Sequence, residues 1–177
     1  MTELTWQLET ERLWLRRITL EDAGLMLAVW NDPRFIRHVG DRGIRTIEEA
    51  HEALRSGAFR LYENYGYGPY SLNRKSDNAP VGICGLFKRD ILDHPDIGFA
   101  VLPDYCGHGI AGEAAAEVVR HAREDLELVE LAGIASPGNT ASIKLLEKLG
   151  LRRRGMITMP GEAEAVCLYQ MPLRQAQ

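Results

Sequence analysis

The stretch Tyr105-Cys106-Gly107-His108-Gly109-Ile110-Ala111-Gly112-Glu113-Ala114 carries more information than any other part of the chain. A predicted strand at Ile97–Leu102 precedes it, and apolar residues recur at helical spacing over Ile110–Ala122 after it. The pattern therefore predicts a strand, a glycine-rich turn and an amphipathic helix. Such a turn exposes backbone N–H groups at the positive end of a helix dipole, which favours an anion, most often a phosphate. Gly107 and Gly109 lack the side chains that would keep such a ligand at a distance.

Two other interpretations of this turn stay open. The plainer one is a tight turn whose glycines take positive φ and bind nothing. The other is a dinucleotide site, because Gly107–Gly112 satisfies GxGxxG. In a Rossmann unit the strand runs directly into the first glycine, whereas Pro103–Cys106 intervenes here, and too little chain follows for two further βα units. The sequence therefore disfavours a dinucleotide site.

Composition limits the class of protein. The chain has 177 residues, 45% hydrophobic and 26% charged, which is typical of one globular domain. We expect this domain to span residues 1–173, with a short disordered tail at 174–177. The net charge of −4 argues against general nucleic-acid binding. No apolar run is long enough to cross a membrane and the N-terminus lacks a signal-peptide core, so we expect a cytoplasmic protein without membrane contact. Three cysteines without CxxC spacing predict neither disulfides nor a metal site.

Hydrophobic periodicity and turn residues predict a mixed α/β chain. Expected strands are Leu13–Ile18, Pro69–Asn73, Val81–Phe87, Ile97–Leu102, Val129–Ala135, Met156–Thr158 and Ala165–Met171. Expected helices run from Thr19 to about Trp30, from Thr46 to about Ser56, from Ile110 to about Ala122 and from Asn139 to Leu149. Asn31-Asp32-Pro33 is expected to stop the first helix, and Tyr62–Gly68 is expected to be a loop. The middle strands follow one another too closely for pure βαβ alternation.

Three patches of this chain resemble the GNAT acyltransferases, and within them the RimJ/RimL branch of ribosomal-protein N-terminal acetyltransferases. Residues 10–16, TERLWLR, match the opening strand TERLxLR of that branch. Residues 105–114 resemble YWGKGYATEA, and residues 139–151, NTASIKLLEKLGL, resemble NxxSxxxLEKLGF. The patches occur in the expected order and together reach across nearly the whole chain.

The resemblance implies a fold and a cosubstrate. The fold is an α/β (α+β) GNAT fold, with a mixed sheet of about seven strands flanked by about four helices. Its fourth and fifth strands splay apart, and acetyl-CoA lies between them. The pantetheine arm would pair with the backbone of Phe99, Ala100 and Val101. The pyrophosphate would lie on the amides of Gly107, His108, Gly109, Ile110 and Ala111, in agreement with the anion argument. No metal is implied.

The same resemblance implies roles near the thioester. Asn139 would hold the pantetheine end of the cosubstrate, although it also reads as a plain helix N-cap and could serve as both. Ser142 would face the cofactor sulfur and meet the leaving thiolate; its plainer interpretation is a local hydrogen bond in the first helical turn. Three positions depart from the family pattern. Cys106 stands where the branch usually has Trp, His108 where Lys or Arg is common, and Leu146 where many members carry the Tyr that protonates the thiolate.

Acetyl transfer also needs a group that takes a proton from the amine. Asp96 is the predicted base, because the family often places an acid before the I-G-F/Y of this strand. An ordinary residue at the start of a strand is an equally good interpretation. His94 is a nearby alternative, although a surface histidine is the plainer interpretation.

The amine acceptor is the least defined feature. In the family it enters opposite acetyl-CoA, here between Asn31–Arg45 and Met159–Glu164. These segments carry charges of both signs, which favours a peptide N-terminus or an amino-acid-like amine. An antibiotic or polyamine acceptor, and a non-catalytic acyl-CoA sensor, remain alternatives. Family members are often dimers, so a homodimer is a further possibility.

Overall fold

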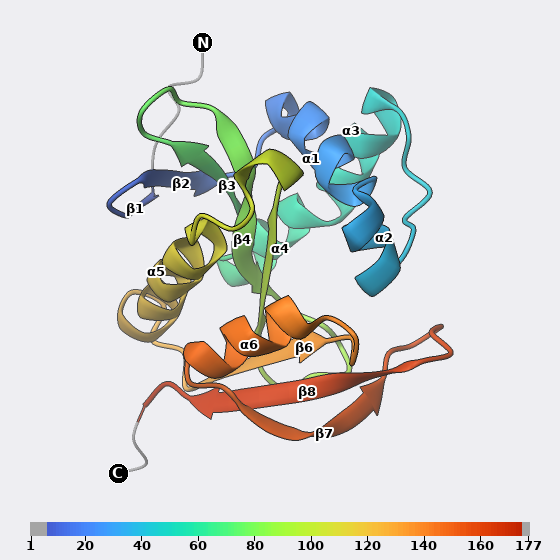
Figure 1. Cartoon of the computed structure of the whole chain (residues 1–177), viewed down its shortest axis with the longest axis vertical. Helices are drawn as coiled ribbons and strands as arrows, with labels where there is room; N and C mark the ends of the chain where they lie inside the picture. Colours follow the sequence, from blue (N-terminus) through green and yellow to red (C-terminus); the bar gives the residue numbers. More distant parts are fainter. Residues whose placement is uncertain (1–6, 175–177) are drawn as a thin grey trace.

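A computed structural model of the chain describes residues 7–174, and the remaining parts of the expected domain and tail lie outside the described residues (Figure 1). The strands are β1 (Leu8–Glu9), β2 (Leu13–Arg17), β3 (Pro69–Arg74), β4 (Pro80–Phe87), β5 (Asp96–Val101), β6 (Glu130–Ala135), β7 (Arg152–Thr158) and β8 (Ala165–Pro172). The helices are α1 (Ala23–Trp30), α2 (Pro33–His38), α3 (Ile47–Ser56), α4 (Ala58–Tyr65), α5 (Ile110–Glu124) and α6 (Thr140–Lys148). Short 3₁₀ turns at Leu20–Asp22 and Pro103–Tyr105 precede α1 and α5.

All strands belong to one sheet of eight, in the order β1-β2-β3-β4-β5-β6-β8-β7. Every neighbouring pair is antiparallel except β5 and β6, which are parallel and meet at a single pair, Asp96 with Ala132. Beyond this pair the two strands diverge. The split lies between the fourth and fifth of the expected strands, as predicted; the two-residue strand β1 shifts the numbering by one. In Figure 1, β6, β8 and β7 accordingly run across the direction of β3 and β4.

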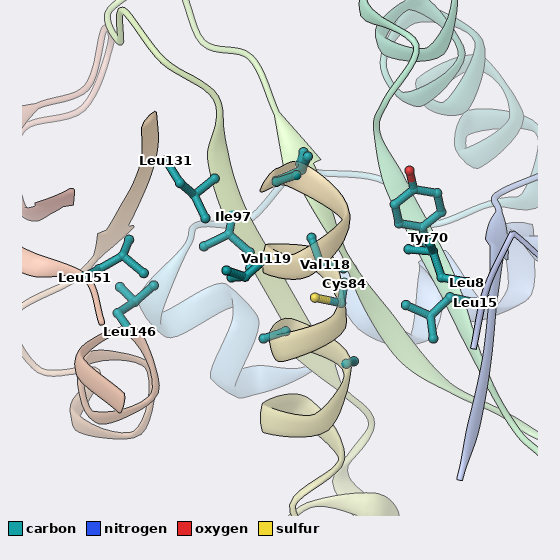
Figure 2. Close-up of a cluster of buried hydrophobic side chains, with 14 of the residues drawn as sticks. Leu8, Leu15, Tyr70, Cys84, Ile97, Val118, Val119, Leu131, Leu146 and Leu151 are labelled. Carbon is teal, nitrogen blue, oxygen red and sulfur yellow. The ribbon is translucent and has the colours of Figure 1, made fainter. Parts of the chain in front are cut away.

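Two hydrophobic clusters cover opposite faces of the sheet. The larger one packs α5 against β2–β6, with Val118 and Val119 beside Ile97 and Cys84, and continues to Leu146 of α6 (Figure 2). The smaller one joins α1, α3 and α4 to the other face and takes in Ala100 and Leu102. The side chains of Phe99 and Val101 pack against the first cluster instead. Strand β5 therefore separates a face covered by α5 from a face covered by α1–α4.

The helical content exceeds the expected four helices at two places. The first helix stops at Trp30 as expected, but Asp32 then caps the short helix α2 by accepting a hydrogen bond from the amide of Arg34, with Pro33 at its first position. Proline has no amide proton to satisfy there and its φ suits a helix start. The Asn-Asp-Pro sequence thus ends one helix and begins another.

The expected loop at Tyr62–Gly68 is wrong over its first half, because Tyr62–Tyr65 belong to α4. Tyr62 faces the smaller cluster and its hydroxyl accepts a hydrogen bond from the amide of Ile18 at 3.0 Å. Gly66, at φ 75°, ends the helix. Tertiary packing of tyrosine outweighed the local turn composition here. The last hairpin also begins earlier than expected, at Arg152.

No helix within residues 7–174 is long and apolar enough to cross a membrane. The three cysteines are free, and Cys84 and Cys167 are buried while Cys106 is exposed. Over the same residues no three His, Cys, Asp or Glu side chains gather in a way that could hold a metal ion.

Candidate active site

The glycine-rich turn has the backbone geometry that an anion site requires. Gly107 and Gly109 have φ of 79° and 75°, values that residues with a Cβ rarely adopt. Gly109 is the N-cap of α5, and its carbonyl accepts a backbone hydrogen bond from the amide of Glu113. The amides of Ile110 and Ala111 therefore have no partner within the helix. A Cβ on Gly107 would meet nothing within 4 Å, so open space lies beside Gly107. The turn thus has the geometry expected of an anion site, and the pyrophosphate at this place stays a prediction.

A clamp from the N-terminal segment holds the turn in place. Glu113 on α5 accepts hydrogen bonds from the hydroxyl of Thr10, from the amide of Arg12 at 2.8 Å and from Arg12 Nε at 2.6 Å. Arg12 Nη1 also donates to the carbonyl of His108 at 2.8 Å. Burial raises the pKa of Glu113, but the hydrogen bonds from Thr10 and Arg12 outweigh it and the pKa is lowered. The first and second sequence patches are thus parts of one structural unit.

The edge of β5 that faces the split offers backbone groups for pairing. The amide of Leu102 donates to Val81 on β4, so the alternation of a strand turns the backbone of Ala100 toward β4 as well. The carbonyl of Pro95 accepts a hydrogen bond from the amide of Ala132 on β6. Because every second residue of a strand points its backbone groups to the same side, the backbone groups of Phe99 and Val101 also face the split. Ala100 therefore contributes its side chain to the opposite face rather than hydrogen bonds along this edge.

Asn139 and Ser142 lie together at the start of α6, on the far side of the split. The side-chain carbonyl of Asn139 accepts from the amide of Ser142 at 3.2 Å, so the expected capping role is present. Its amide nitrogen makes no hydrogen bond to a described residue. The hydroxyl of Ser142 makes no hydrogen bond with the described residues either, whereas its amide makes the local bond to Asn139. The roles of both residues toward the cosubstrate stay predictions.

Asp96 lies at the closed end of the split and is only 1% exposed. Arg89 Nε donates to both carboxylate oxygens at 3.1 Å. Burial raises the pKa of Asp96 to about 6, against the opposing effect of the Arg89 guanidinium. The carboxylate is therefore desolvated, as expected for a base, but it is also engaged in an ion pair. His94 is the alternative candidate for the base, and its Nε2 lies 3.8 Å from Oε2 of Glu130. The assignment of Asp96 as proton acceptor stays a prediction.

Leu146 belongs to the core and not to the split. It is 1% exposed, and a Cβ added to Gly133 on β6 would lie 2.7 Å from its Cδ2 atom. A glycine in the strand thus makes room for a leucine from the helix. No hydroxyl stands at this position to protonate a thiolate.

Helix α2 adds three contacts that the sequence did not predict. Arg34 donates through Nη2 to the carbonyl of Val101 at 3.0 Å, and its Nη1 lies 2.8 Å from the sulfur of Cys106. Its carboxylate partner is Asp32, which is buried. His38 Nδ1 lies 2.9 Å from the hydroxyl of Ser136, at the end of β6. These partners are 67 and 98 residues apart in the chain, so no local pattern could have predicted them.

Comparison with known proteins agrees with this geometry. The family described as the acetyltransferase (GNAT) domain matches residues 12–152, most of the chain. The chain belongs to the GNAT acetyltransferase family. An uncharacterized N-acetyltransferase, YoaA from Bacillus subtilis, is 28% identical over 152 residues, which is 85% of each chain.

Solved structures show the same fold. The structure of a putative ribosomal-protein-serine acetyltransferase from Vibrio cholerae superposes with a TM-score of 0.75 at 18% identity, over 96% of this chain and 98% of that one. The spermidine N-acetyltransferase of Vibrio cholerae, solved with CoA and spermine, gives 0.76 at 14% identity, over 92% and 96%. The RimL ribosomal-protein alpha-N-acetyltransferase, solved with coenzyme A, gives 0.78 at 16% identity, over 92% and 95%.

Membership of the GNAT family defines the reaction class. The protein is an N-acetyltransferase that uses acetyl-CoA as its acetyl donor. This sets aside the interpretation of the turn as a dinucleotide site, and the alternative of a non-catalytic acyl-CoA sensor.

Proposed function

We propose that this GNAT enzyme acetylates the primary amine of a peptide N-terminus or of a small amino-acid-like molecule, and that it belongs to the RimJ/RimL-like branch. The three sequence patches support the branch, and the charges of the acceptor segments support the acceptor. The proposal concerns the acceptor and the site residues, because the use of acetyl-CoA follows from the family.

The acceptor class is supported by charged side chains on both sides of the acceptor entrance that have no ionic partner among the described residues. In the segment Asn31–Arg45 the two carboxylates are already paired, Asp32 with Arg34 and Asp41 with Arg45. Two guanidiniums remain without a carboxylate among the described residues, those of Arg37 and Arg42. In the facing hairpin tip, Glu162 and Glu164 are exposed and have no ion pair there either.

This arrangement suits an acceptor that carries both signs of charge. An ammonium group is attracted to the side of Glu162 and Glu164, and a carboxylate or acidic side chain is attracted to the side of Arg37 and Arg42. Figure 1 places the β7–β8 hairpin tip on the same side of the molecule as α2. A polycationic acceptor would be attracted by the two glutamates of the hairpin tip but repelled by the two arginines of the facing segment.

The proposed site residues fall into two groups. Phe99, Val101 and the turn Gly107–Ala111 bind the pantetheine and pyrophosphate. Ala100 lies between Phe99 and Val101, with its backbone turned toward β4 and its side chain in the smaller cluster. Asn139 holds the pantetheine end, and Ser142 donates to the thiolate as it leaves. Bound acetyl-CoA supplies the activated acetyl group. Asp96 is the predicted proton acceptor.

A panel of amines tests the proposal. Thiol release from acetyl-CoA is measured with peptides that have free N-termini, the same peptides blocked at the N-terminus, free amino acids, spermidine and an aminoglycoside. We expect release with free peptides or amino acids and none with blocked peptides. Turnover of spermidine or the aminoglycoside at a higher kcat/KM than any peptide or amino acid would refute the acceptor class. Size-exclusion chromatography with light scattering tests the proposed homodimer.

A further inference from the structure

Helix α2 bridges the open end of the split between β5 and β6. Arg34 bonds to the carbonyl of Val101, at the end of β5, and His38 contacts Ser136, just after the end of β6. The two α2 residues are four positions apart, so they lie one above the other on the same face of the helix. Since β5 and β6 pair only at Asp96 and Ala132, the sheet itself does not join these two ends.

The contact of His38 reaches the turn that leads into α6. The carbonyl of Ser136 accepts a hydrogen bond from the amide of Asn139 at 2.9 Å, and Asn139 in turn caps the amide of Ser142. His38 therefore lies against the same short turn that positions the two residues proposed to hold the thioester end. It approaches from α2, in the segment where the acceptor is proposed to enter, and not from the side of α5.

The surroundings of His38 leave one ring nitrogen free for chemistry. The ring is half-buried, and Ser136 is its one hydrogen-bond partner within residues 7–174. On α2 the neighbouring charged residues are Arg34 and Arg37, and the turn from Ser136 to Asn139 carries no charged side chain. When Nδ1–H donates to the serine hydroxyl, the lone pair of Nε2 is available as a proton acceptor.

Asp96 is placed differently. It lies at the closed end of the split, is almost fully buried and is bonded through both oxygens to Arg89. His38 lies at the open end of the split and Asp96 at its closed end. An acceptor amine that enters beside α2 therefore meets His38 before it reaches Asp96.

We infer that His38, oriented by Ser136, takes the proton from the acceptor amine. This rests on the proposed function, because it assumes that the acceptor enters below α2. His38 Nε2 receives a proton from the ammonium group, which frees the nitrogen lone pair. That nitrogen forms a bond to the acetyl carbon, the carbon–sulfur bond breaks, and the sulfur leaves as a thiolate. The nitrogen loses a second proton, the thiolate takes up one proton, and His38 returns its proton to the solvent.

The first test separates the base from the structural contact. Asparagine can place an amide nitrogen near the position of Nδ1, so His38→Asn keeps a donor for Ser136 but has no basic group. We expect His38→Asn to lower kcat by about a hundredfold or more, the usual contribution of a general base, with the Kd of acetyl-CoA changed less than twofold. The matched control is His51→Gln, which removes a histidine of α3 whose ring contacts the carbonyl of Leu20, and should leave kcat within about twofold. An unchanged kcat in His38→Asn overturns the inference.

The second test uses readouts that a structural role would not move. Added imidazole should restore activity to His38→Ala but not to Ser142→Ala. The acidic limb of the kcat/KM profile against pH should vanish in His38→Asn and persist in Asp96→Asn; the reverse result assigns the proton to Asp96 and overturns the inference. Ser136→Ala should lower kcat about tenfold, because the ring loses its orientation, with little change in the Kd of acetyl-CoA.

A third measurement does not depend on finding the acceptor. Nitrogen-15 NMR of the histidine rings should show His38 in the Nδ1–H form at neutral pH, and Ser136→Ala should change that signal. The Nε2–H form overturns the inference even when no acceptor is known. A wild-type protein that acetylates no amine in the panel contradicts the proposed acceptor class instead.

Discussion

Arg12 Nε lies 2.6 Å from Glu113 Oε2, although 101 residues separate them in the chain. Since Arg12 also donates to the carbonyl of His108, the N-terminal segment holds the turn that is proposed to bind the pyrophosphate. The patches at residues 10–16 and 105–114, which are far apart in the sequence, are therefore parts of one structural unit.

Glu113→Gln should weaken acetyl-CoA binding by about three- to tenfold and lower the free energy of unfolding by about 1–2 kcal/mol, because a charge-assisted hydrogen bond to Arg12 is lost. Calorimetry and urea unfolding measure the two effects. Glu117→Gln is the matched control, since Glu117 lies on the same helix, pairs with Arg120 and has a side chain 17% exposed against 18% for Glu113. Equal changes in acetyl-CoA affinity for the two variants would mean that Arg12 does not organise the turn.

CoA and acetyl-CoA should raise the melting temperature of the wild-type protein, because a ligand that binds only the folded state stabilises it. Gly109→Val should abolish most of this shift by covering the amides of the turn. Valine is strained at this φ, so the variant alone will melt earlier. Gly66→Val controls for that strain, since Gly66 has the same φ of 75° at the end of α4. If Gly109→Val keeps the full ligand shift, the phosphates bind elsewhere.

Ser142→Ala should lower kcat by about tenfold while the Kd of acetyl-CoA stays within about twofold, because its hydroxyl is proposed to act only on the leaving thiolate. Asn139→Ala should mainly raise the KM for acetyl-CoA and also cost about 1 kcal/mol of stability through the lost N-cap. Steady-state kinetics and thermal unfolding distinguish the two variants. Small and equal kinetic effects would leave both residues as parts of the α6 cap alone.

The pKa of Asp96 is raised by burial from 3.8 to about 6, which makes a prediction about stability. Between these values the folded protein binds more protons at this carboxyl than the unfolded chain does. The contribution of Asp96 to the free energy of unfolding therefore falls as the pH rises from about 4 to about 6, and is constant above that. The stability difference between wild type and Asp96→Asn, measured by urea unfolding, should show this fall. A difference that increases over the same range would mean that the ion pair with Arg89 governs the titration.

The sequence predicted the parts of the fold whose signals are local. The glycine-rich turn, the amphipathic helix α5 and the cap at Asn139 are each written within a few residues, and all three are present. Helix α4 was missed because Tyr62 is held by partners outside its helix. Its hydroxyl accepts from the amide of Ile18, 44 residues away, and donates to the carbonyl of Pro69. The contacts of α2 with Val101 and Ser136 were missed for the same reason. Local patterns describe the elements, whereas contacts across the split exist only once the sheet has folded.

The charges on the two sides of the acceptor entrance should act separately. Glu162→Gln with Glu164→Gln removes the carboxylates of the hairpin tip, and should raise the KM of amine acceptors about three- to tenfold at low salt, because their ammonium groups lose an attracting field. Arg42→Ala should raise KM only for acceptors that also carry a carboxylate or an acidic side chain. Arg42 lies over the indole ring of Trp30, with 4.9 Å between its guanidinium carbon and the ring centre, so this substitution also removes a cation–π contact. Arg42→Lys keeps the charge and separates the two effects.

Kinetics at low and high salt complete this test. The effect of the glutamate variants should fade at high salt, since exposed charges are screened beyond a Debye length of about 10 Å at 0.1 M. The effect of Arg42→Ala on peptides should fade less if the guanidinium binds a carboxylate directly. Neutral amides of the same peptides, which lack the terminal carboxylate, should be insensitive to Arg42→Ala. If the arginine variant leaves every acceptor unchanged, or if polyamines are the best substrates, then the entrance does not select a two-signed acceptor and the proposed acceptor class is wrong.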